Sequence, residues 1–172
     1  DPPQRRYLMS APEGLDAEVT VDEADAVFSA ARVRARLAAG QYSIGAFRDT
    51  LNWGRDRLYA MFDDGGRAET LVKARSHLVD ECLRAAWTKF FPAPTPGLAM
   101  LAVGGYGRSE LLPHSDIDIL LLHEGDALQR HRGSLEQLTA FGWDIGLEVG
   151  QSVRTLDECV FEAEKAITVI TN

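Results

Sequence analysis

The stretch GGYGRSELLPHSDIDILLL, residues 104–122, decides the fold class of this sequence. Two glycines end one apolar run, and further along Asp116 and Asp118 flank an isoleucine at the start of a second apolar run. Alternate residues of a strand point to the same side. The pattern therefore predicts two carboxylates side by side, with Ile117 and Ile119 turned to the core. Burying an unpaired charge is costly, so these acids need a partner.

A divalent cation is the partner that the paired aspartates favour. Neighbouring like charges repel each other. Mg²⁺ removes that repulsion, because it takes oxygen ligands and is typically held by one or two carboxylates together with substrate phosphates. Two such metals can clamp the attacking and leaving oxygens of a phosphoryl transfer. We therefore expect Mg²⁺, with Mn²⁺ as the alternative, on Asp116 and Asp118.

The glycines within residues 104–107 predict a tight turn that brings bare backbone N–H groups close to an anion. An arginine next to them is placed to add a fork of donors for phosphate, and two serines each offer a hydroxyl. The expected nucleotide-binding residues are Gly104, Gly105, Arg108, Ser109 and Ser115. A glycine turn followed by a metal-bearing strand forms a coherent triphosphate site.

Spacing excludes the other common phosphate and metal motifs. No GxxxxGK[ST] loop occurs in the sequence. A dinucleotide-binding loop needs a helix directly after its glycines and an acid about twenty residues further on, whereas here the acids come sooner and as a pair. The EF-hand pattern fails because no glutamate follows at the required offset. A lone glycine turn or a lone DxD pair is common, so the specificity comes from their order between two apolar runs.

Length and composition indicate one globular domain with a small helical annex. The chain has 172 residues, of which 45% are hydrophobic and 26% charged. The net charge of -8 argues against a nucleic-acid partner, and the arginines of residues 32–36 are typical of a solvated helix face. No apolar run is long enough for a membrane span, so we expect no membrane partner. The two cysteines lie far apart and do not call for an oxidising compartment, so we expect a cytoplasmic location. Cys82 and Cys159 are expected to be core residues.

The expected fold class is α/β (α+β), with N-terminal helices followed by a small mixed sheet flanked by helices. Residues 1–20 are typical of a loop or N-terminal arm. The proline-rich stretch 91–97 breaks a helix and separates a helical region, 21–92, from a core, 93–172. The expected helices cover residues 22–40, 43–62, 68–90, 126–141 and 156–165. The expected strands lie in LAMLAVGG (98–105), DIDILLLH (116–123) and residues 146–155.

Two separated motifs resemble a known family. The glycine pair and the DxD pair resemble the GG/GS…DxD signature of the polymerase-β-like nucleotidyltransferase superfamily. More closely, AVGGYGRSELLPHSDIDILLL (102–122) resembles the nucleotidyltransferase domain of the bacterial PII uridylyltransferase/uridylyl-removing enzymes (GlnD type). WDIGLEVGQSVRTLDEC (143–159) and the final ITVITN resemble segments that follow in the same family. The motifs span residues 98–172, and they imply a nucleotidyltransferase fold for the core.

The resemblance implies an Mg²⁺-dependent transfer of UMP from UTP to a tyrosine hydroxyl of the PII nitrogen-signalling protein, with release of pyrophosphate. By the same resemblance, Gly104 and Gly105 hold the triphosphate, and Asp116 and Asp118 bind metal. The position after Arg108 is often a glycine in this family, and here it is a serine. That serine fits if its φ is negative.

The superfamily also uses a third carboxylate on a later strand. Glu148, in Leu-Glu-Val, fits an apolar-acid-apolar strand pattern and is preferred. The role implied for it is to bind the catalytic metal and help deprotonate the tyrosine. Asp144, in Trp-Asp-Ile, is the alternative and would share the face of Glu148 if the strand began early.

The full enzymes of this family carry a metal-dependent HD hydrolase domain that removes UMP and ACT domains that sense glutamine. No histidine in this sequence is followed by aspartate, so we expect this chain neither to remove UMP nor to sense glutamine. The sequence lacks an initiator Met and ends in an apolar stretch without a helix stop signal. We therefore expect it to be part of a longer enzyme.

Other functions stay open. One is a nucleotidyltransferase with another nucleotide or target, such as a glutamine-synthetase adenylyltransferase-like enzyme or a small AMP-adding toxin-type protein. Another is a catalytically silent module that binds nucleotide or PII. A DNA polymerase relative is disfavoured by the pI of about 5.0 and by the lack of a basic groove in the sequence pattern. The residues alone do not choose between UTP and ATP.

Overall fold

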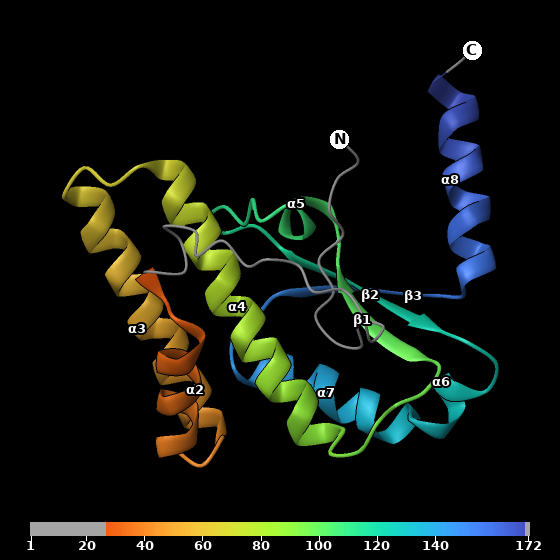
Figure 1. Cartoon of the computed structure of the whole chain (residues 1–172), viewed down its shortest axis with the longest axis horizontal. Coiled ribbons are helices and arrows are strands. Elements are labelled where there is room, and N and C mark those ends of the chain that lie inside the picture. The colour runs from red at the N-terminus through yellow and green to blue at the C-terminus, as the bar shows by residue number, and fades with distance from the viewer. Residues whose placement is uncertain (1–26, 171–172) are drawn as a thin grey trace.

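The computed structural model describes residues 27–170, and side chains up to residue 164. Within these residues, three helices of ten or more residues come first and a three-stranded sheet with its own helices follows (Figure 1). The first three are α2 (Ala30–Ala39), α3 (Ile44–Asp63) and α4 (Ala68–Phe90). The rest are β1 (Leu98–Ala102), α5 (Gly104–Gly107), β2 (Ile117–His123), α6 (Ala127–Arg130), α7 (Arg132–Asp144), β3 (Val149–Arg154) and α8 (Leu156–Ile170). The expected mixture of helices and a small sheet is confirmed.

Serine caps set the starts of the first two helices. The Ser29 hydroxyl accepts a hydrogen bond from the Arg32 N–H at the start of α2, and the Ser43 hydroxyl accepts one from Ala46 at the start of α3. The helix predicted over 22–40 is confirmed by α2 over Ala30–Ala39, but it is interrupted at residues 28–29, where the Ser29 cap precedes α2. Residues 22–26 of that prediction, and the arm at 1–20, lie outside the described residues.

The predictions for the later helices are confirmed in part. The expected helices over 43–62 and 68–90 correspond to α3 and α4. The single helix expected over 126–141 is two helices, because His131 ends α6 and precedes α7.

The sheet has the order β1-β2-β3, with β1 antiparallel and β3 parallel to the central strand β2. The third strand is shorter than predicted because Gly146 belongs to the end of α7. With φ +84, Gly146 donates its N–H to the Trp143 carbonyl, and the Leu147 N–H bonds to the Gly142 carbonyl. These two bonds form a Schellman motif. The strand starts only at Val149.

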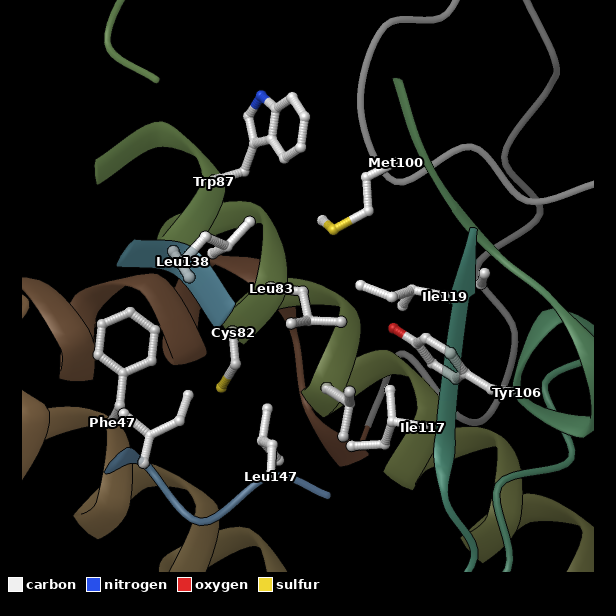
Figure 2. Packing of buried hydrophobic residues seen from close by; sticks show 14 of the residues in the cluster. Phe47, Cys82, Leu83, Trp87, Met100, Tyr106, Ile117, Ile119, Leu138 and Leu147 are labelled. Carbon is white, nitrogen blue, oxygen red and sulfur yellow. The ribbon is translucent and has the colours of Figure 1, made fainter. Parts of the chain in front are cut away.

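One hydrophobic cluster joins the two regions that the proline stretch was expected to separate. It includes residues of α2, α3, α4, α7 and both β1 and β2. Figure 2 shows Leu83 and Trp87 of α4 together with Met100, Ile119 and Leu138. Helices α4 and α7 thus pack on the sheet face that carries Met100 and Ile119. The helical region and the sheet share a core.

The two cysteines differ in their surroundings. Cys82 lies in the core, fully buried, and burial raises the pKa of its thiol to about 12. Cys159 lies half-buried on α8, so its prediction as a core residue is wrong. The reason is that α8 extends away from the rest of the molecule (Figure 1), with Leu156, Val160 and Phe161 more than half exposed.

The arginine run of α2 packs against neighbouring helices. The guanidinium carbons of Arg32 and Arg36 lie 5.1 and 4.5 Å from the ring centre of Trp53 on α3. Arg34 forms an ion pair of 3.2 Å with Glu81 on α4. The run is exposed, as expected of a helix face, and it also joins α2 to its neighbours. Within residues 27–170, no helix is long and apolar enough to cross a membrane.

Candidate active site

The chain turns sharply where β1 ends, and glycine is required at two positions of that turn. Gly104 has φ +61, a left-handed conformation that costs little only for glycine. A Cβ on Gly107 would lie 2.7 Å from the carbonyl oxygen of Ala102. The predicted glycine turn forms the short helix α5. Its start is joined to β2 by a 3.0 Å hydrogen bond from the Val103 N–H to the Asp118 carbonyl.

The carboxylate of Asp118 lies between two glycines. A Cβ on Gly104 would lie 2.9 Å from Oδ2 of Asp118, and a Cβ on Gly150 would lie 2.7 Å from Oδ1. Gly150 is the direct partner of Asp118 in the parallel β2–β3 pair. The absence of both side chains makes room for the carboxylate beside the glycine turn. Sequence reasoning missed Gly150, because its role depends on a cross-strand register.

The strand register also places Asp116 and Glu148. Ile117 and Ile119 are 2% and 4% exposed, whereas Asp116 and Asp118 are exposed, so the predicted alternation is confirmed. Glu148 is exposed and lies directly before β3, where its carbonyl accepts a 2.9 Å hydrogen bond from the Ile117 N–H. Continuing the register by one residue sets Glu148 beside Asp116, on the face that carries Asp118.

Asp144 lies in a different setting. It is the last residue of α7, and its backbone carbonyl accepts a 2.6 Å hydrogen bond from Nε of Arg48. Asp144 was expected to share the face of Glu148 only if the strand began early. Because β3 begins at Val149, Asp144 does not belong to that strand.

The donor set fits a hard divalent cation held in part by substrate. Asp118 of β2 and Asp116, directly before β2, would supply carboxylate oxygens, and Mg²⁺ is commonly held by one or two carboxylates when substrate phosphates complete its coordination. Among the side chains that the structure describes, no three of His, Cys, Asp or Glu converge closely enough to hold a metal ion. Asp116 and Asp118 are therefore the residues that would hold the cation, and Glu148, the predicted third ligand, does not converge with them closely enough to form a three-ligand group.

The remaining expected phosphate ligands follow the glycine turn. Arg108 forms a 2.8 Å ion pair with Glu110, and both side chains are 59% exposed. Ser115 is half-buried and lies directly before Asp116, with its N–H bonded to the Leu112 carbonyl. Ser109 has φ +62, so the condition of a negative φ, under which this serine was expected to fit, is not met. The turn requires a left-handed residue there, which is the conformation that a glycine adopts at lowest cost.

Helix α4 supports the loop between β1 and β2 from within the protein. The Tyr106 hydroxyl donates a 2.6 Å hydrogen bond to Oδ1 of Asp80. Ser76 Oγ accepts one of 3.4 Å from the Leu111 N–H, and Nη1 of Arg75 donates one of 2.9 Å to the Leu112 carbonyl. Partial burial lowers the pKa of Arg75 from its ordinary value. Sequence reasoning missed these contacts because their partners lie far apart along the chain.

Comparison with known proteins agrees with this geometry. The family model "Putative nucleotidyltransferase DUF294" matches residues 55–151, more than half of the chain. The chain belongs to this nucleotidyltransferase family. The match extends from α3 to β3, so it includes α4, the glycine turn, the aspartates and Gly150.

Several curated relatives carry one name, bifunctional uridylyltransferase/uridylyl-removing enzyme. The chain is 43% identical to that of Pseudomonas putida (strain F1) over 146 residues, which are 85% of this chain and 16% of the relative. The relatives from Ectopseudomonas mendocina and Azotobacter vinelandii are 43% and 42% identical over the same shares. The chain thus spans 16% of the length of these relatives. No solved structure matches the chain significantly. The resemblance found in the motifs is confirmed.

Proposed function

We propose that this chain transfers UMP from UTP to a tyrosine hydroxyl of a PII signal protein and releases pyrophosphate. The observation that carries the proposal is the Asp118 carboxylate, which lies between Gly104 and Gly150 beside the glycine turn. This arrangement places an acid that can hold metal next to backbone that can bind phosphate. The relatives named uridylyltransferases support the choice of reaction.

The glycine turn binds the triphosphate in this proposal. In this proposal the backbone N–H groups of Gly104 and Gly105, at the start of α5, would bind phosphate oxygens, because the first N–H groups of a helix have no carbonyl partner within it. Arg108 can exchange its exposed partner Glu110 for a phosphate, since surface ion pairs contribute little stability. Ser115, directly before Asp116, would add a hydroxyl donor, and Ser109 is left out of the proposed set because its φ is positive.

The carboxylates hold the metal and receive the proton. Asp116 and Asp118 would hold Mg²⁺ or Mn²⁺, which when bound offsets negative charge on the α-phosphate and the pyrophosphate. Glu148, on the same face of the sheet, would accept the proton of the attacking tyrosine hydroxyl. Nucleotidyl transfer depends mainly on such positioning and charge neutralisation, so these side chains account for the chemistry.

A cytoplasmic location without membrane or nucleic-acid partners is part of the proposal. The net charge of -8 supports the absence of a nucleic-acid partner, because a negative protein repels a phosphate backbone.

Pyrophosphate release tests the proposal. The chain would be incubated with Mg²⁺, a PII protein and each nucleoside triphosphate in turn, with Asp118→Asn as the control. We expect release that depends on both UTP and PII and that is lost in D118N. Release with ATP instead would keep the mechanism and make the chain an adenylyltransferase. Nucleotide binding without release from any triphosphate would contradict the proposal and favour a silent module.

A further inference from the structure

We propose that Tyr106 and Asp80 are a positioning pair. Through one buried hydrogen bond they hold the glycine turn on α4 in the shape that binds the triphosphate. The inference rests on the proposed function, and it assigns to α4 a part in nucleotide affinity.

The pair is buried and short. Tyr106 is 1% exposed and Asp80 is 4% exposed, and the O–O distance between them is 2.6 Å. A hydrogen bond to a carboxylate is stronger than one between neutral groups, and burial removes the competition of water. Tyr106 lies within the four residues of α5, so this bond fixes the glycine turn itself and not a distant part of the loop.

Tyr106 and Asp80 lie on the opposite side of the sheet from the side chains of Asp116 and Asp118. Figure 2 shows the ring of Tyr106 beside Ile117 and Ile119, both on the core face of β2, with its hydroxyl oxygen directed toward α4. Asp118 faces the other way, beside Gly104 and Gly150. Tyr106 is therefore placed to orient the turn, and its hydroxyl is not placed to touch substrate.

The loop also contains strained backbone that needs support. Ser109 has φ +62 and His114 has φ +63, and neither is a glycine. Such conformations persist only where the surrounding structure over-determines them. Tyr106 precedes both, and the contacts of Ser76 and Arg75 with the loop lie between them. Helix α4 thus supports the stretch from Tyr106 in the glycine turn to Leu112.

Nucleotide kinetics give the first test, with a matched control on the same helix. Tyr106→Phe removes only the hydroxyl, and Cys82→Ala removes a fully buried group of α4 that lies apart from Tyr106 (Figure 2). We expect Y106F to raise the KM for the triphosphate about tenfold, the factor that corresponds to one lost hydrogen bond, with the KM for PII unchanged. C82A should leave both KM values unchanged. Asp80→Asn keeps an acceptor for the Tyr106 hydroxyl, so its KM for the triphosphate should lie between those of the wild type and Y106F.

Hydrogen exchange gives a second test that does not depend on the reaction. The amides of residues 107–110 are all hydrogen-bonded within the turn. These amides should exchange at least tenfold faster in Y106F than in C82A. The two variants are compared under conditions in which their free energies of unfolding are equal. Equal exchange and equal triphosphate KM in these two variants would overturn the inference. If the wild type binds no triphosphate, the proposed function fails. The exchange rates then decide whether the pair holds the turn.

Discussion

A Cβ on Gly150 would lie 2.7 Å from Oδ1 of Asp118, its direct partner across the parallel β2–β3 pair. Real Cβ atoms essentially never approach another atom so closely. Gly150→Ala should therefore displace the carboxylate and leave the strand intact, because position 150 has no positive φ. We expect transferase activity to fall about 100-fold or more, since small misplacements of reacting groups cost on that order. The unfolding free energy should drop by no more than about 2 kcal/mol.

Gly133→Ala is the control for that variant. Gly133 lies in α7 with nothing near the position of its Cβ. Alanine is the better helix former by about 1 kcal/mol, so G133A should be slightly more stable and fully active. Activity assays and urea unfolding of both variants check the expectation. A fully active G150A would show that the position of Asp118 is not fixed by the missing side chain.

The predictable part of the site is the part encoded by neighbouring residues. The alternation of Asp116 and Asp118 with two buried isoleucines is visible in the sequence because a strand has a period of two. The glycine turn is visible because several glycines gather within residues 104–107. These local signals are sufficient to locate the site and two of its acids.

The rest of the site depends on tertiary contacts. The closeness of Gly150 to Asp118 follows from the register of two strands, and the support of Tyr106 by Asp80 joins residues 26 positions apart. The strand boundary predicted at Gly146 is wrong, because a glycine beside an apolar run fits a strand boundary as well as the helix end that it forms. The φ of Ser109 depends on the whole loop and does not follow from residue type.

Removing one charge from the aspartate pair should separate catalysis from stability. Asp118→Asn leaves the shape of the side chain almost unchanged, and turnover should fall below detection in a pyrophosphate assay. Without metal, the variant should be equal to or more stable than wild type, by less than about 1 kcal/mol, because one of two neighbouring charges is gone. Thermal melting with and without Mg²⁺ measures this, and Mg²⁺ should stabilise the wild type more than the variant. Asp56→Asn, an exposed change on α3, is the control and should remain active. An active D118N would contradict the assigned role.

Ser109→Gly should stabilise the protein. Ser109 has φ +62, a conformation that costs a non-glycine residue roughly 1–2 kcal/mol. Glycine relieves this strain, but its greater freedom in the unfolded chain cancels part of the gain in stability. We expect a net gain of about 0.5–1 kcal/mol in the free energy of unfolding by urea. Ser134→Gly, within α7, is the control and should lose about 0.5 kcal/mol. A loss of similar size in both variants would show that the Ser109 side chain contributes more than its backbone strain costs.

The start of α8 should weaken in acid. The Glu158 carboxylate accepts a 2.7 Å hydrogen bond from the Thr155 N–H, and the Glu158 N–H donates to the Thr155 hydroxyl at 3.2 Å, which together form a capping box. The hydrogen bonds from Thr155 hold the pKa of Glu158 below its ordinary value of 4.5. A lowered pKa in the folded state means that the cap contributes fully above pH 4.5 and is lost as the pH falls through the lowered value.

An NMR titration of the Glu158 carboxyl measures that pKa directly. Thr155→Ala removes the hydroxyl and should return the pKa part of the way to its ordinary value. A pKa that T155A leaves unchanged would show that the hydroxyl of Thr155 has no part in stabilising the carboxylate.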